Sequence, residues 1–169
     1  DVPFFFYGGT ALGTGRGTEI SQLEDFKAKY ILVVTPNVNV STAEAFKRLS
    51  VPHLTNKSSK SILQICCDES KKQDLQQKKS VNDFEKSVFK IEPEIKRVRN
   101  RFVQLEAERV LMSGSGASVF AVFNDDERLQ NALRAIKIEP NWRVFPVQTV
   151  SRREYQDFVN LDKKLFSKD

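Results

Sequence analysis

The residues with the clearest chemical potential form a glycine-rich turn between two apolar segments. Gly114, Ser115 and Gly116 (the glycine loop) separate segments 109–112 and 117–123. Glycine permits positive φ and has no Cβ to block close approach, so backbone N–H groups in such a turn can converge on an anion. The pattern favours a loop that faces phosphate. A tight turn between buried strands can also contain Gly-x-Gly, so a purely structural role stays open.

Three further motifs accompany the glycine loop: Asp1-Val2-Pro3-Phe4-Phe5-Phe6-Tyr7-Gly8-Gly9-Thr10-Ala11, Asn82-Asp83-Phe84-Glu85 and Pro93-Glu94-Ile95. Together the four resemble the 4-diphosphocytidyl-2-C-methyl-D-erythritol kinases, a family within the galactokinase, homoserine kinase, mevalonate kinase and phosphomevalonate kinase (GHMP kinase) superfamily. The match runs from residue 1 to about residue 123, whereas residues 57–79 fit the family poorly. The resemblance implies an enzyme that uses ATP and Mg²⁺ to phosphorylate a hydroxyl of the erythritol, in the non-mevalonate route to isoprenoids.

The resemblance also indicates which part of such a kinase the sequence represents. The family's Gly-rich, Ser-containing ATP loop and its lysine-bearing strand precede the Asp-Val-Pro motif, which stands here at residues 1–3. We therefore expect the substrate-binding C-terminal portion: residues 1–28 as a remnant of the ATP-binding domain, 29–150 as the C-terminal domain and 151–169 as a surface tail. Without the ATP loop's backbone donors, the chain alone is expected not to phosphorylate substrate.

The resemblance assigns roles to individual residues. Asp1 matches the aspartate proposed as catalytic base in relatives, and phosphoryl transfer to an alcohol needs an acceptor for the hydroxyl proton. Thr42 and Phe46 match positions that contact the cytidine end of the substrate, where an aromatic face suits a pyrimidine. The glycine loop would shape the phosphate region, and no residue is assigned to a metal. Core packing of Phe46, and helix capping by Asn82 and Asp83, stay open.

A binding module without catalysis is the alternative function, and a paralogous GHMP kinase is another. The net charge of +5 and the lysine-rich stretch 57–79 could attract a nucleotide or a nucleic acid. No aromatic residues interleave with those lysines, as a base-stacking surface would require, so nucleic acid is not the expected partner. The expected ligand is a small molecule with a cytidine diphosphate group.

The composition is that of an ordinary globular domain. The 169 residues are 40% hydrophobic and 29% charged, enough for one core and an appended piece. No apolar run reaches membrane-spanning length and no signal-peptide pattern opens the sequence, so a cytoplasmic location is expected. Cys66 and Cys67 are adjacent and His53 is the only histidine, which argues against a structural disulfide or zinc site.

The hydrophobic pattern predicts an α+β domain, a ferredoxin-like α/β sandwich with helices on one face of an antiparallel sheet. Strands are expected at residues 30–34, 109–112, 117–123 and 142–150. Helices are expected from a Ser41 cap to about Leu49, behind Ser80, from Pro93 to Leu105 and from Asp125 to Ile136. The glycine-rich residues 4–23 suit a hairpin left from the first domain, and Phe4–Phe6 are expected in the core.

Overall fold

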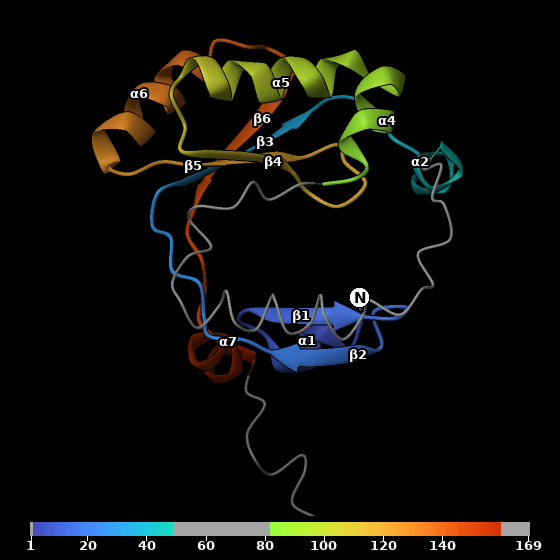
Figure 1. The fold of residues 1–169 in the computed structure, drawn as a ribbon. Coiled ribbons are helices and arrows are strands. Elements are labelled where there is room, and N and C mark those ends of the chain that lie inside the picture. The colour runs from blue at the N-terminus through green and yellow to red at the C-terminus, as the bar shows by residue number, and fades with distance from the viewer. Residues whose placement is uncertain (1, 49–81, 160–169) are drawn as a thin grey trace, which may run out of the picture. The chain divides into compact units, whose positions relative to one another are not determined.

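The structure is a computed structural model that describes residues 2–48 and 82–159 (Figure 1). These residues form two compact units. Unit 1 contains residues 2–27 and 149–159, and unit 2 contains residues 28–48 and 82–148. Asp1 and the lysine-rich stretch 57–79 lie outside the described residues, so the roles expected there stay predictions.

Unit 1 combines a pair of strands with two helices. Its elements are α1 (Phe4–Tyr7), β1 (Ala11–Thr14), β2 (Glu19–Gln22) and α7 (Arg152–Val159). Strands β1 and β2 pair antiparallel, with Leu12 opposite Ser21. The connection between them contains Gly15 and Gly17 at φ values of 63° and 74°, which residues with a Cβ rarely adopt.

The three consecutive phenylalanines of unit 1 do not form a core, so that expectation is wrong. Helix α1 has no buried residue, and Phe5 and Phe6 are 60% and 61% exposed. Successive side chains on a helix point about 100° apart, so three neighbours in a single turn cannot all face one core.

Unit 2 is built on a four-stranded sheet. Its strands are β3 (Ile31–Pro36), β4 (Arg109–Met112), β5 (Val119–Val122) and β6 (Trp142–Val147). The spatial order is β4-β5-β3-β6, and every neighbouring pair is antiparallel. The β-branched and apolar run in β3 suits its central position, where Leu32 and Val34 are completely buried.

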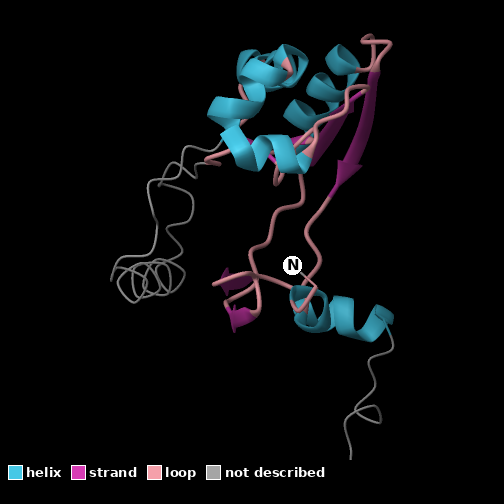
Figure 2. Cartoon of the chain, turned by 90° about the vertical axis from the view of Figure 1, so that its right-hand side faces the viewer, coloured by secondary structure: helices cyan, strands magenta, loops and turns pink. Residues whose placement is uncertain are grey.

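The helices of unit 2 lie on one face of this sheet (Figure 2). They are α2 (Thr42–Arg48), α4 (Glu85–Ile91), α5 (Pro93–Gln104) and α6 (Asp126–Ile136). Helix α5 buries Ile95, Val98 and Phe102 at spacings of three and four, the stripe that the sequence predicted. The expected cap of α6 is confirmed, because the Asp125 carboxylate accepts the Arg128 N–H at 2.8 Å.

The mixed α/β character and the antiparallel sheet are therefore confirmed. Within the described ranges, no helix has both the length and the apolarity needed to cross a membrane.

Candidate functional site

The glycine loop lies in the turn from β4 to β5. Its two glycines have positive φ, 53° at Gly114 and 95° at Gly116. The turn is closed by hydrogen bonds from the Ser113 N–H to the Ser118 carbonyl (2.8 Å) and from the Gly116 N–H to the Ser113 carbonyl (3.0 Å). Among the described residues, the N–H groups of Gly114 and Ser115 find no acceptor. Two backbone donors of the loop are therefore available to a ligand.

The two glycines of the loop face different surroundings. A Cβ at Gly116 would lie 3.3 Å from the Met112 sulfur and 3.5 Å from Ile95 Cδ1, against the core. A Cβ at Gly114 would meet nothing within 4 Å. Gly116 thus anchors the loop on the helices beneath it, and Gly114 occupies the open side where a ligand can approach.

Two residues just before and within α4 hold the loop in place. The Asn82 side-chain amide donates to the carbonyls of Met112 and Gly114, both at 2.8 Å. The Glu85 carboxylate accepts the Met112 N–H at 2.9 Å. Because the C=O and N–H of a trans peptide point in opposite directions, fixing the Gly114 carbonyl on Asn82 aims the Ser115 N–H away from Asn82. The free donor is therefore oriented by the protein before any ligand arrives.

Helix α2 carries Thr42 at its first position and Phe46 one turn later, and Thr42 contacts the glycine loop. The hydroxyls of Thr42 and Ser115 lie 3.1 Å apart and share a hydrogen bond. The ring of Phe46 meets the ring of Phe84 edge to face, with centroids 4.9 Å apart and planes at 88°. Phe46 is nevertheless 59% exposed. The contact fixes the orientation of the ring while leaving much of it open to solvent.

Five of the six predicted site residues thus fall in unit 2: Thr42, Phe46 and the three residues of the glycine loop. Core packing of Phe46 is excluded by its exposure. The capping role considered for Asn82 is supported, because its Oδ1 accepts the Phe84 N–H at 3.0 Å in the turn that leads into α4, whereas no such bond is seen for Asp83 among the described residues. Sequence reasoning missed the support that Asn82 and Glu85 give the loop. The Asn-Asp-x-Glu motif was the available signal, but only the fold shows what it contacts.

A separate groove of unit 2 lies along α5, with a volume of about 510 Å³ and a lining that includes Lys96 and Arg97. The Arg97 guanidinium already binds the Glu94 carboxylate at 2.7 and 2.9 Å and Glu139 at 3.0 Å. It also lies 4.4 Å from the centre of the Trp142 ring. The bonds from Arg97, then the one from the Trp142 indole, hold the pKa of Glu94 below its usual value against the opposing effect of burial. This cluster is satisfied internally, so we assign it to packing.

The comparisons with known proteins agree with this geometry. Residues 68–141 match the family described as GHMP kinases C terminal. Over these residues the chain is similar to the C-terminal domain of the GHMP kinases. The match includes α4, α5 and the glycine loop, whereas α2 with Thr42 and Phe46 lies outside it.

Two curated relatives illustrate the similarity, and both are named 4-diphosphocytidyl-2-C-methyl-D-erythritol kinase. The protein of Solibacter usitatus (strain Ellin6076) is 33% identical over 164 residues, covering 92% of this chain and 49% of the relative. The protein of Listeria monocytogenes serotype 4b (strain CLIP80459) is 34% identical over 165 residues, covering 95% and 54%. The chain therefore spans about half the length of the curated relatives it matches.

Solved structures show the same fold. A crystal structure of 4-(cytidine 5'-diphospho)-2C-methyl-D-erythritol kinase matches with a TM-score of 0.65 and 24% identity, covering 89% of this chain and 54% of that one. Homoserine kinase from Cytophaga hutchinsonii matches with a TM-score of 0.61 and 18% identity, covering 89% and 51%. At these identities the likeness supports the fold of the domain.

Proposed function

We propose that the chain forms the substrate-binding part of a kinase that transfers the γ-phosphate of ATP to a hydroxyl of 4-diphosphocytidyl-2-C-methyl-D-erythritol. The names of the relatives support the substrate class. The observation that carries the proposal is the glycine loop, where the N–H groups of Gly114 and Ser115 have no acceptor among the described residues and the Ser115 hydroxyl bonds to that of Thr42. Such donors bind phosphate oxygens without a large cost of reorganisation, because Asn82 already holds the loop.

The exposed ring of Phe46 is proposed as the platform for the cytosine. Aromatic stacking on a nucleic-acid base contributes roughly 1–3 kcal/mol, and an exposed, orientationally fixed ring is suited to it. The Thr42 hydroxyl, one helical turn away, can exchange its bond to Ser115 for one to the ligand. The aromatic ring and the hydroxyl would then recognise the cytidine end, and the loop the phosphates.

Asp1 is proposed as the catalytic base that accepts the proton of the attacking hydroxyl. ATP is the phosphate donor in the proposal, and Mg²⁺ is its expected companion, which would neutralise charge on the phosphates. Among the described residues, no three His, Cys, Asp or Glu side chains gather in a way that could hold a metal.

Three further expectations, on the domain fold, the flanking segments and the location, complete the proposal. Along the chain, the described elements of unit 2 run strand, helices, strand, strand, helix, strand, and their sheet order is β4-β5-β3-β6; both support a ferredoxin-like domain close to the predicted range 29–150. Residues 1–28 are proposed as part of the neighbouring domain of the kinase, and 151–169 as a surface extension. A cytoplasmic location is proposed as well.

The proposal is tested by mixing the purified full-length protein with ATP, Mg²⁺ and the cytidine diphosphate substrate. Release of ADP should occur together with a new phosphate ester on the erythritol. Mevalonate and homoserine serve as controls for the paralogous kinases. Phosphorylation of either control in place of the cytidine compound would reject the substrate. Binding without turnover would instead support a module without catalysis.

A further inference from the structure

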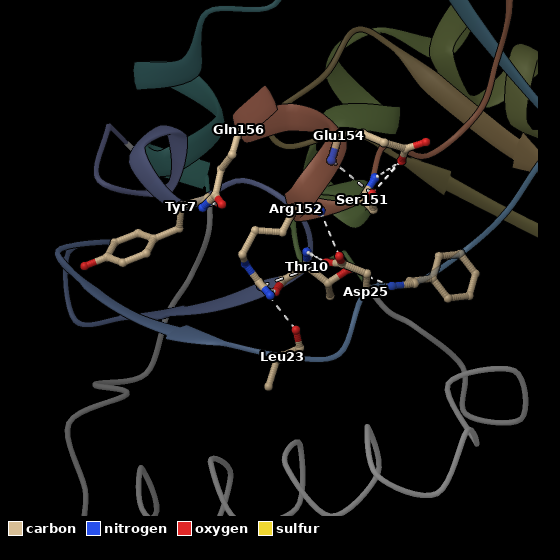
Figure 3. Close-up of polar contacts among 9 residues, drawn as sticks. Tyr7, Thr10, Leu23, Asp25, Ser151, Arg152, Glu154 and Gln156 are labelled. Carbon is tan, nitrogen blue, oxygen red and sulfur yellow. Dashed lines mark hydrogen bonds and ion pairs between the residues drawn. The ribbon is translucent and has the colours of Figure 1, made fainter. Parts of the chain in front are cut away.

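A partly buried ion pair and its hydrogen bonds join the two ends of unit 1 (Figure 3). The Asp25 carboxylate accepts the N–H of Thr10 at 2.9 Å and the N–H of Arg152 at 2.7 Å. The Arg152 guanidinium in turn donates to the carbonyls of Thr10 (2.8 Å) and Leu23 (3.2 Å). These four residues form a clasp that fastens the start of α7 to the segments on both sides of the β1–β2 pair.

Helix α7 also holds α1 directly. The Tyr155 hydroxyl donates to the Phe5 carbonyl at 2.7 Å, and the Gln156 amide donates to the Tyr7 carbonyl at 3.3 Å. A Cβ at Gly8 would lie 2.2 Å from the Tyr155 ring, and Gly8 has a φ of +66°. The glycine after α1 is thus required by the close approach of Tyr155 and by its own backbone conformation.

Helix α1 cannot hold this position by itself. It is four residues long, has no side-chain cap hydrogen bond and buries none of its residues. A single isolated turn is unstable in water because nucleation fixes several backbone angles for one hydrogen bond. The bonds from α7 are therefore the main constraints on α1 among the described residues.

We propose that α7 is a positioning element for catalysis, with Tyr155 and the Asp25–Arg152 clasp holding α1, the helix that begins three positions after Asp1 in the sequence. The role rests on the proposed function of Asp1 as base. Misplacing a reacting group by about 1 Å can cost two orders of magnitude in rate, so a small loosening of α1 is expected to lower turnover.

The first test measures local order and needs no activity. In Tyr155→Phe, amide hydrogen exchange at Gly8, whose N–H bonds to the Phe4 carbonyl at 3.0 Å, should speed up by about tenfold. Exchange at Phe123 in unit 2, bonded to the Tyr30 carbonyl at 2.8 Å, should not change. Phe158→Ala, at an 89% exposed site on the same helix, is the matched control and should leave Gly8 unchanged.

The second test is a double-mutant cycle in the full-length protein. Tyr155→Phe should lower turnover by about threefold to tenfold, with the KM values of both substrates within about twofold. In an Asp1→Asn background the same substitution should have almost no further effect. A merely structural role would lower turnover equally in both backgrounds. Gln156→Ala repeats the cycle with a second bond to α1, should Tyr155→Phe fail to fold.

The outcomes separate the two proposals. Equal losses in both backgrounds, or unchanged exchange at Gly8, overturn the positioning role while leaving the kinase function in place. Normal turnover by Asp1→Asn removes the base and the positioning role together. Absence of any phosphorylation of the cytidine compound by the unmodified protein rejects the function itself, and the exchange experiment then still reports whether α7 orders α1.

Discussion

The glycine loop of unit 2 and the clasp of unit 1 use backbone groups in opposite ways. In the clasp, the N–H groups of Thr10 and Arg152 both end on the Asp25 carboxylate. In the loop, the N–H groups of Gly114 and Ser115 have no protein acceptor among the described residues. Satisfied donors fix a chain segment, whereas unsatisfied donors on a fixed loop can bind a ligand. The contrast separates a region built for positioning from one built for recognition.

The two regions also differ in what secures them. The loop is held by the neutral Asn82 amide, which donates to backbone carbonyls, and by the Glu85 carboxylate, which accepts a backbone N–H. The clasp uses a cation and an anion whose side chains are only 20% and 19% exposed. A charged pair in that setting makes the clasp sensitive to pH.

The largest effect on turnover is expected from a substitution of Asp1, the proposed base. Asp1→Asn keeps size and hydrogen bonding but removes the basic charge, so turnover in the full-length protein should fall by roughly 10²–10⁴ with substrate binding mostly retained. Steady-state kinetics and substrate binding measure this. A fall of less than about tenfold at unchanged binding rejects the base. A collapse of Mg²⁺–ATP affinity would instead favour an electrostatic role.

The next largest effect should follow from distorting the loop. Gly116→Val places a β-branched side chain at a φ of +95° and against Met112, so turnover should fall more than substrate affinity, by about one to two orders of magnitude. Gly114→Ala is the control, because its Cβ meets nothing within 4 Å and only the φ of +53° opposes it. If Gly116→Val folds and has the same kinetic constants as the unmodified protein, the loop is an ordinary turn with no role in turnover.

A smaller, selective effect is expected from removing the aromatic platform. Phe46→Ala should weaken binding of the cytidine substrate by about tenfold, within the 1–3 kcal/mol of a stacked base, while the KM for ATP stays nearly unchanged. Val103→Ala, at a 53% exposed site on α5, controls for loss of surface apolar area. Equal losses for both substrates would mean that Phe46 only supports the fold.

The smallest effect concerns the acid stability of the clasp. The Arg152 N–H, then that of Thr10 and the cations Arg152 and Lys27, hold the pKa of Asp25 below its ordinary 3.8, against the opposing effect of burial. A lowered folded-state pKa contributes stability above pH 4, which is lost as the pH falls through the folded pKa. Asp25→Asn should cost about 1–3 kcal/mol at pH 7 and flatten this acid dependence.

Urea unfolding at pH 7 and at pH 3 measures the acid dependence of the clasp. Asp157→Asn is the control on the same helix, because its side chain is 75% exposed and pairs only with Arg153 at 3.8 Å. An unchanged difference between the two pH values in Asp25→Asn would show that the clasp carries no acid-labile stability.

Much of unit 2 could be predicted from the sequence, because its signals are local. The β-branched run of β3, the stripe of α5 and the cap at Asp125 each lie within one element, and the structure confirms them. The contacts of the glycine loop could not be predicted, since Asn82 lies 30 and 32 positions before the carbonyls it binds. Periodicity does not indicate which distant segment a polar side chain will meet.

Unit 1 was harder to predict from the sequence, because its contacts also join residues that are far apart in the chain. The bond between Arg152 and Asp25 joins residues 127 positions apart, and the hydroxyl of Tyr155 reaches Phe5 across 150 positions. The sequence predicted a surface tail from residue 151 and assigned no partner to these side chains. The sequence also predicted wrongly that Phe4–Phe6 lie in a core. Hydrophobicity alone does not show that a segment forms one short helical turn.

Amide exchange of the glycine loop in the full-length protein tests the recognition site most directly. With the cytidine diphosphate substrate and a non-hydrolysable ATP analogue at saturation, exchange at Gly114 and Ser115 should slow by at least about tenfold, because their free N–H groups gain phosphate acceptors. Exchange at Gly116 should change little, since its N–H already bonds to the Ser113 carbonyl at 3.0 Å. Unchanged exchange at Gly114 and Ser115 under saturation would contradict the assignment of the glycine loop to phosphate binding.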